Sequence, residues 1–463
     1  MRYRALAEVV VDVWEQSLLV TALVMAGCFF VAEVCRRLVP PLRSLGLPGS
    51  ILAGMFGLLV GPQLLSILPI NNAVLTTLVY HGLAIVFIAI ALTPPDPGSS
   101  SHSATADATS MGFAIVVMIS LQTVVGIAVV LSLGLLSEPT HPGFGLMLPL
   151  GFEQGPGQAM SMGKAWEASG GLVDGEQIGL VVAAAGFAWS IVVGVPLVAF
   201  GRLRGWTSSK RAAMTAPEPA VTSRGQPGSV DIMTQQLVII GLCYSVTLGL
   251  CSGLYTLLMP IAEDVAPMVW GFHFIIGALV ASAVRAALLK MGSGEVLSRA
   301  LLPRISGTAV DITTVCAIAA VQLSVFASNW VPIAVLTTIG GVVTLVVCVW
   351  LAPRAFNEDR FEHMVVWFGM STGTLPMGLA LVRIIDPELR TSAAISAVAG
   401  SAVATLGAIP VVLLLHPAMV STWPTAGGLW LLLLATVAYA VVVTVVWWRT
   451  GRLRVGQGGD WVT

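Results

Sequence analysis

Two groups of oxygen-bearing and helix-breaking residues interrupt apolar stretches of this chain. The first interruption, within residues 143–171, reads Glu153-Gln154-Gly155-Pro156-Gly157-Gln158. The second, within residues 365–382, reads Ser371-Thr372-Gly373-Thr374-Leu375-Pro376. Carboxylate, amide and hydroxyl oxygens bind hard cations and polar small molecules, and backbone carbonyls freed where a helix breaks add further oxygen ligands. The pattern therefore predicts reversible binding of a small polar ligand and a cation.

The residue types at each interruption have separate tasks in this chemistry. Glycine lets the backbone take conformations that other residues resist, and proline leaves a carbonyl without its helical donor. The expected ligands of a sodium ion are Gly155, Gly157, Thr372, Thr374 and Asp311. The expected substrate-binding residues are Glu153, Gln154, Gly155, Gln158, Ser161, Ser371, Thr372, Gly373, Thr374 and Pro376. The alternative is that the glycines and prolines mark kinks or close helix packing.

Three ionisable or amide residues within apolar segments leave alternatives open. Glu153 can coordinate a cation, carry a coupling proton, accept a substrate amine, or lie at an aqueous mouth. Asp311 either faces the site or lies at a membrane boundary near Arg304. Gln122 either bonds between helices or lines the path.

The composition is that of a membrane protein. The chain has 463 residues, of which 56% are hydrophobic and 10% charged, and its mean hydropathy is +0.92. Soluble domains carry about 25% charged residues. The net charge of −1 gives no indication of nucleic-acid binding, and the six cysteines lie at scattered spacings without a metal or disulfide pattern.

Enzyme signatures are missing from the sequence. We find no His-Glu-x-x-His, Gly-x-Ser-x-Gly or Gly-x-x-x-x-Gly-Lys motif, which speaks against an intramembrane enzyme and an ATP-driven pump. We expect no enzymatic activity and no organic cofactor.

About eleven apolar segments are long enough to cross a membrane as helices. The predicted crossings are residues 17–35, 47–66, 73–93, 111–135, 177–201, 235–260, 267–289, 307–327, 330–352, 391–415 and 426–448. The polar stretches 94–110 and 202–233 are predicted to be linkers. The expected fold class is therefore an all-α polytopic membrane protein.

The placement of lysine and arginine favours two re-entrant hairpins over two further crossings. If both interrupted segments dip into the membrane and return, the basic clusters from Arg36 to Arg454 all fall on the cytoplasmic side. The N-terminus is then outside and the C-terminus cytoplasmic, although Arg2 and Arg4 argue against that placement. The alternative is thirteen simple crossings.

The re-entrant interpretation divides the chain into two inverted five-helix repeats. The predicted parts are an N-terminal span 1–45, repeat 46–201 with hairpin 144–170, a cytoplasmic linker 202–233, a connecting span 234–262, repeat 263–416 with hairpin 364–382, and an extra C-terminal span and tail 417–463. Paired interrupted helices at matching places in two halves are typical of a transporter's binding site.

At these residues the chain resembles the bacterial sodium/glutamate symporter family, from about Leu45 to His416. Family members carry a glycine-rich first hairpin, matched here by Glu153 to Ala159, and a second hairpin matched by Gly373 to Met377. The resemblance implies inverted repeats in a homodimer, with an elevator-like movement of the domain that carries both hairpins.

The hairpins depart from the family pattern at four positions. Gln154 stands where the family has a histidine, and Glu153 replaces a glycine. Met377 and Leu381 stand where the family has threonine and asparagine. These changes remove polar groups that would hold an amino-acid head group, so the resemblance supports transport more strongly than it supports glutamate.

Together these observations predict sodium-coupled symport of L-glutamate or a related small carboxylate or amino acid. The alternative is an exchanger or a proton-coupled carrier of another organic anion. The expected partners are the substrate, a sodium ion, the lipid bilayer and a second copy of the chain. The expected location is the cell membrane.

Overall fold

Long apolar stretches of this chain fold into α-helices, and no β-strand occurs in the part of the chain that the structure describes. The structure is a computed structural model. It describes residues 17–39, 48–94, 102–136, 141–168, 172–207, 231–261, 266, 268–386, 391–415, 426–454 and 461.

Ten helices in these ranges are long and apolar enough to cross a membrane. They lie within α2 (Ser17–Leu38), α5 (Asn72–Leu92), α6 (His102–Leu136), the continuous pair α9 (Gly175–Val192) and α10 (Gly194–Leu203), α11 (Ile232–Leu258), α13 (His273–Lys290), α14 (Leu301–Ala319), α16 (Trp330–Ala355), α17 (Arg360–Arg383) and α19 (Ala426–Arg449). The helical content and the number of apolar helices confirm the expectation of a polytopic all-α membrane protein.

The other helices are shorter or only partly described. They are α4 (Gly49–Val60), α7 (Gly143–Pro149), a π-helix (Leu150–Gln154), α8 (Pro156–Ala168), α12 (Met268–Gly271), a 3₁₀-helix (Gly294–Val296), α15 (Leu323–Ser328) and α18 (Ser392–Leu415).

Three predicted boundaries differ from the structure. The expected crossing 47–66 is only the 12-residue helix α4, because the chain leaves the helix at Gly61, just before Pro62. The expected linker 94–110 is helical from His102 onward, where the small residues of α6 pack against α18. The expected crossing 307–327 starts earlier, at Leu301, and ends at Ala319.

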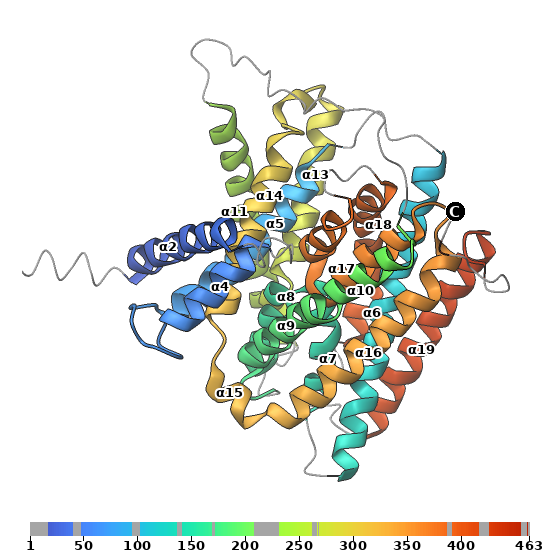
Figure 1. Cartoon of the computed structure of the whole chain (residues 1–463). Coiled ribbons are helices and arrows are strands. Elements are labelled where there is room, and N and C mark those ends of the chain that lie inside the picture. The colour runs from blue at the N-terminus through green and yellow to red at the C-terminus, as the bar shows by residue number, and fades with distance from the viewer. Residues whose placement is uncertain are drawn as a thin grey trace, which may run out of the picture.

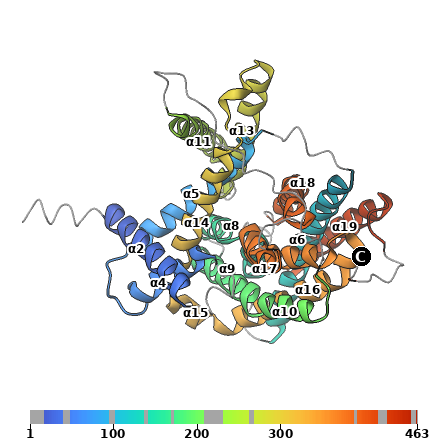
Figure 2. The same ribbon diagram turned by 45° about the horizontal axis from the view of Figure 1, so that its top comes forward.

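The helices form two bundles that lie side by side (Figures 1 and 2). We call α2, α4, α5, α11, α13 and α14 the first bundle, and α6 to α10 with α16 to α19 the second bundle. Buried Ile88, Ile240 and Leu302 form a core where α5, α11 and α14 meet in the first bundle. In the second bundle, a core that includes Met111 and Trp367 joins α6 to α17.

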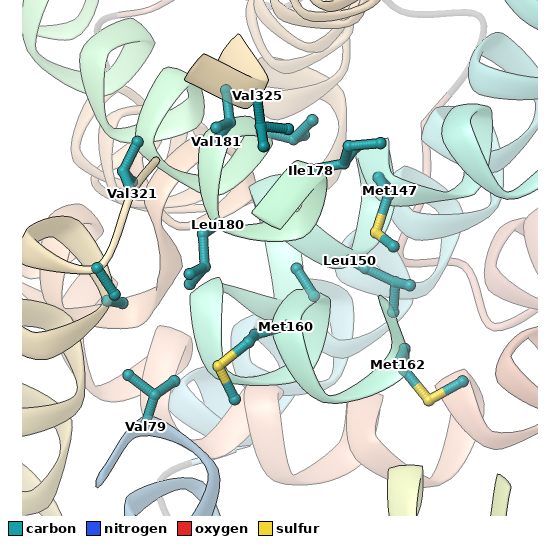
Figure 3. Packing of buried hydrophobic residues seen from close by; sticks show 14 of the residues in the cluster. Val79, Met147, Leu150, Met160, Met162, Ile178, Leu180, Val181, Val321 and Val325 are labelled. Carbon is teal, nitrogen blue, oxygen red and sulfur yellow. The ribbon is translucent and has the colours of Figure 1, made fainter. Parts of the chain in front are cut away.

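Apolar side chains join the two bundles. Ile51 of α4 and Ile318 of α14 share a buried cluster with Phe187 of α9 and Met377 of α17. Figure 3 shows a larger cluster in which Met160 of α8 and Leu180 of α9 lie near residues of the first bundle. The bundles therefore meet through side chains of the two interrupted segments and α9.

Packing inside the first bundle is mirrored. Helix α4 lies along α14, with Gly54 against Ile318, and α13 lies along α5, with Gly277 against Ile88. Helix α2 packs on α4 as α11 packs on α13. Within the first bundle, these contacts of α2, α4 and α5 thus have counterparts in those of α11, α13 and α14.

Many helix termini gather at one end of the molecule, which we call the basic end. Contacts between these termini place the start of α6 beside the end of α16, the end of α10 beside the start of α17, and the start of α17 beside the start of α18. Arg285 near the end of α13 donates to the carbonyl of Thr93, just after α5. Arg204, Arg354, Arg360 and Arg454 lie at or next to the second-bundle termini gathered here.

Close backbone contact at glycine holds the first interrupted segment to α6. A Cβ atom added at Gly126 would lie 2.0 Å from the carbonyl oxygen of Gly145, and one added at Gly145 would lie 2.2 Å from that of Gly126. Such small residues let helix backbones approach in membranes.

We predict that Gly126→Ala lowers the apparent melting temperature of the purified protein, because the added methyl must push two backbones apart. Overpacking of this kind costs about 1–3 kcal/mol. The matched control is Gly134→Ala on the same helix, where an added Cβ meets nothing within 4 Å. Equal melting temperatures for the two variants would contradict the packing described.

Candidate binding site at two interrupted helices

The first interrupted segment consists of two helical pieces separated at Gly155. Helix α7 passes into the π-helix Leu150–Gln154, and α8 starts at Pro156. Gly155 has φ 92° and ψ 178°, a conformation that is essentially confined to glycine. Pro156 occupies the first position of α8, where the missing N–H has no helical partner to lose. The sequence therefore breaks this helix at a defined residue.

The second interrupted segment, α17, breaks at Gly373 and Thr374, where φ and ψ are −155° and 25°, and 69° and 170°. A Cβ atom added at Gly369 would lie 2.7 Å from the Cα atom of Gly378. Nine residues of continuous helix span about 13.5 Å. The second half of α17 therefore folds back beside the first half.

The two breaks touch each other. A Cβ atom added at Gly155 would lie 2.4 Å from Cγ2 of Thr374. A Cβ atom added at Gly186 of α9 would lie 2.3 Å from the carbonyl oxygen of Thr372. Gly155 thus lets the first break pack directly on the second, and Gly186 lets α9 approach the second break.

Buried polar side chains of the two interrupted segments and of three other helices surround the breaks, and we call them the tip cluster. Its members are Gln122, Glu153, Ser190, Thr344, Ser371 and Thr372. Each is at most 8% exposed. They come from α6, the π-helix, α9, α16 and the first half of α17.

Hydrogen bonds within the tip cluster satisfy carbonyls near the α17 break. Nε2 of Gln122 donates to Thr344 Oγ1 at 3.0 Å and to the carbonyl of Ser371 at 2.8 Å. Ser190 Oγ donates to the carbonyl of Gly369 at 3.2 Å and lies 2.6 Å from Thr372 Oγ1. The irregular backbone is thus held by side chains of α6 and α9.

Glu153 is the carboxylate of the tip cluster. It lies next to Ser371 and near Cys348 of α16. An ionised carboxylate away from water costs several kcal/mol unless a cation, a proton or hydrogen-bond donors compensate it. Its position between the two breaks suits a group that gains and loses a positively charged partner.

The structure brings together most residues that the sequence singles out. Glu153, Gly155, Ser371, Thr372, Gly373 and Thr374 all lie at the two breaks. Gln154 is half-buried beside them, and Pro376 opens the second half of α17. Both segments therefore contribute these residues to one region of the structure.

Four expected residues lie differently. Gly157 packs on Leu83 of α5, Gln158 is buried within α8, and Ser161 donates to the carbonyl of Gly271 at 3.2 Å. Asp311 is exposed on α14, and no described hydrogen bond or ion pair joins it to the tip cluster. These contacts position α8 against the first bundle.

Sequence reasoning did not single out Ser190 and Thr344. Each is a lone hydroxyl in an apolar helix, and such residues usually bond to their own helix backbone. The sequence left Gln122 either bonding between helices or lining the path. Its hydrogen bonds to α16 and α17 show that it bonds between helices. A polar residue in the middle of an apolar span was the available signal.

A second buried polar group lies at the basic end. Asp107 accepts from the backbone and side-chain nitrogens of Asn357, and Asp359 accepts from Ser392. His363 stacks on Phe356 with ring centroids 4.4 Å apart. These contacts fix the start of α17 to α6 and α18, so they position the second segment.

No protein family matches this chain, and no curated protein shows significant similarity to it. Among the described residues, no group of three or more histidine, cysteine, aspartate or glutamate side chains could hold a metal ion. The function must therefore be argued from the two interrupted segments and the tip cluster.

We predict that Gly155→Ala lowers the apparent melting temperature, because alanine disfavours the backbone conformation at Gly155 and its methyl meets Thr374. Strain of this kind costs about 1–3 kcal/mol. The double variant Gly155→Ala/Thr374→Ser should recover part of the loss, since Thr374→Ser removes the methyl that clashes.

The control for backbone strain alone is Gly205→Ala, since Gly205 has φ 69° and nothing within 4 Å of an added Cβ. It should show a smaller loss, and Thr374→Ser should not rescue it. Additive effects of Gly155→Ala and Thr374→Ser would argue against contact between the breaks.

Proposed function

We propose that this protein is a secondary active transporter that carries a small carboxylate or amino acid, coupled to sodium. The observation that carries the proposal is the contact of two interrupted helices at a buried polar cluster. Irregular backbone at membrane depth is tolerated only inside protein or along a wet cavity. Paired breaks of this kind are the recurrent design of substrate and ion sites in transporters.

In this proposal both interrupted segments are re-entrant hairpins. Helix α17 starts beside Asn357 and is followed by Ser392, which bonds to Asp359, so both of its ends lie at the basic end. Helix α6 starts at the basic end and α10 ends there, since Trp206 packs on Phe361. The segment between α6 and α9 therefore enters and leaves at the opposite end.

The two hairpins then belong to two repeats with inverted orientation. The mirrored pairs α4 on α14 and α13 on α5 support this, because one repeat supplies α4 and α5 and the other α13 and α14. Since α2 packs on α4 as α11 packs on α13, we extend the five-helix repeats to include α2 and α11.

We place the basic end in the cytoplasm of a cell-membrane protein. Short cytoplasmic loops carry an excess of lysine and arginine. Among the described basic residues of the second bundle, only Lys164 of α8 lies at the other end, where it pairs with Glu176 of α9 at 3.6 Å. The N-terminus is then outside and the C-terminus inside.

Alternating access in this proposal is a movement of the second bundle against the first. Many contacts between the bundles are apolar, such as Met377 on Ile318 and Gly157 on Leu83, and apolar contacts lack directional bonds that would resist sliding. The movement would have to break the hydrogen bonds from Ser161 to Gly271 and from the backbone of Gln322 to Gln177. The elevator-like character of the movement, and a homodimer built on the first bundle, follow from the family resemblance.

A carboxylate substrate fits the helix polarity at the site. Helix α8 and the second half of α17 both start at the breaks. Helix N-termini carry partial positive charge and free N–H groups, which favour anions. L-glutamate is the first substrate to test, although Met377 and Leu381 offer no polar group to a second functional group.

Glu153 favours a second candidate function, a proton-coupled carrier or exchanger of another organic anion. A buried carboxylate between two gates can exchange a proton as readily as a metal cation. The two candidates share the fold and the site and differ in the coupling ion.

We predict that proteoliposomes accumulate at least one acid from a panel that starts with L-glutamate when an inward sodium gradient is imposed. Collapse of that gradient should abolish accumulation, because the ion supplies the driving force. Glu153→Gln should lower the uptake rate about tenfold or more, the loss expected for a charge-assisted contact. Radiolabelled uptake checks each point.

The control is Glu176→Gln, an acidic residue near the opposite end that should leave uptake close to wild type. Accumulation driven by a proton gradient without sodium would favour the second candidate. No accumulation and no counterflow of any acid would refute transport.

We also predict the orientation. In a cysteine-free background, Val173→Cys should react with a membrane-impermeant maleimide in intact cells, because Val173 is 78% exposed between α8 and α9. Arg204→Cys, after α10, should react only after the cells are permeabilised. The reverse pattern would invert the proposed topology.

A further inference from the structure

Three buried oxygen atoms of the tip cluster have no hydrogen-bond partner among the residues that the structure describes. They are Oε1 of Gln122, Oε2 of Glu153 and Oγ of Ser371. The side chains are 1%, 8% and 0% exposed, respectively. Buried polar atoms are almost always paired, so three unpaired oxygens in one cluster indicate a ligand that supplies the missing interactions.

Ser371 places these oxygens in one neighbourhood. Its carbonyl accepts from Nε2 of Gln122 at 2.8 Å, and its hydroxyl lies next to the carboxylate of Glu153. A carbonyl oxygen cannot donate, so the contact to Ser371 fixes the amide of Gln122 with the nitrogen on that side. Oε1 of Gln122 is therefore an acceptor that faces away from this bond.

The chemistry of the three atoms selects a hard cation. All are oxygens, one belongs to a carboxylate, and none comes from nitrogen or sulfur, which is the ligand preference of alkali and alkaline-earth ions. A single carboxylate balances one positive charge. The remaining oxygens of Gln122 and Ser371 are neutral, so a monovalent ion leaves the site uncharged.

A proton is the competing occupant, because a protonated Glu153 could donate to the neighbouring hydroxyl of Ser371. A proton on Glu153 pairs that carboxyl with one other oxygen, whereas one cation can bind all three oxygens at once.

We propose that Gln122, Glu153 and Ser371 bind one sodium ion that bridges α6 and the two interrupted helices. The role of this ion as the coupling ion rests on the proposed function, but its binding does not. The site contains none of the five sodium ligands expected from the sequence, which are Gly155, Gly157, Thr372, Thr374 and Asp311.

Neighbouring bonds hold the site in place without the ion. Thr344 accepts the second hydrogen bond of Gln122, and Ser190 bonds to Gly369 and Thr372 on either side of Ser371. The ion would therefore bind a preformed pair of neutral ligands and draw in the carboxylate from the first interrupted segment. Ion binding in this arrangement ties the two breaks together.

The test is thermal unfolding of the purified full chain while sodium chloride replaces choline chloride at constant ionic strength. A ligand that binds only the folded state raises the apparent melting temperature in a saturable way. We expect such a rise for the wild type. Glu153→Gln and Ser371→Ala should each raise the half-saturating sodium concentration about 10- to 100-fold, because each removes one ligand of a charged group.

The matched control is Ser120→Ala on α6. Ser120 is also fully buried, but its hydroxyl donates to the carbonyl of Val116 at 2.8 Å, within its own helix. This variant should keep the wild-type sodium response. If Glu153→Gln fails to fold, Gln122→Met and Ser371→Ala test the same site.

Three results would overturn the site. The first is a sodium response in Glu153→Gln that equals that of the wild type. The second is a loss of the sodium response in Ser120→Ala as large as in Ser371→Ala. The third is stabilisation by acidification alone that Glu153→Gln abolishes, which would assign the site to a proton. Counterflow in proteoliposomes separates this inference from the proposed function. Sodium binding without counterflow would keep the sodium site and refute transport. Counterflow without a sodium-dependent rise in melting temperature would keep transport and refute the sodium site.

Discussion

The structure depends on how the chain satisfies backbone polar groups where two helices are broken inside an apolar protein. A helix satisfies its own backbone, and a break releases carbonyls that find no water in a hydrocarbon environment. Here Gln122 and Ser190 bond to the carbonyls of Ser371 and Gly369. Helices α6 and α9 must therefore lie where these side chains reach the break, and this requirement organises the second bundle.

The kinds of contact inside and between the bundles differ. Within the second bundle, helices meet backbone to backbone at glycines, as at Gly126 with Gly145 and Gly163 with Gly175. Between the bundles the contacts are made mainly by apolar side chains such as Leu83 and Met377. Close-packed backbones resist rearrangement more than flexible side chains do, so the second bundle is suited to act as one body.

The polytopic helical architecture could be predicted from the sequence, because long apolar runs are strong signals. The breaks at Gly155 and Gly373 were visible as glycine and proline beside polar residues. The length of α4 could not be predicted, because the apolar run in the sequence continues past Gly61, where the chain leaves the helix. The helical start of α6 was hidden by its polar composition, which a contact with Asn357 compensates.

Only those site residues that are close together in the sequence could be predicted. Residues within each interruption could be grouped by their spacing, and the structure places Glu153, Ser371 and Thr374 together. Ser190 and Thr344 come from distant apolar helices, and Ser190 bonds to Thr372 across 182 positions of sequence. A single sequence carries no signal for such a pairing. Asp311 shows the converse, since a carboxylate in an apolar span proved to be exposed.

The two interrupted helices have mirrored shapes but unequal chemistry. The first contributes a carboxylate, Glu153, and the second contributes the hydroxyls of Ser371 and Thr372. A change in net charge at the site therefore acts by electrostatics mainly on the first helix, while the second responds through hydrogen bonds. In the proposed transporter, the two segments would therefore respond unequally to the same bound ion, which would give the transport cycle a built-in directionality.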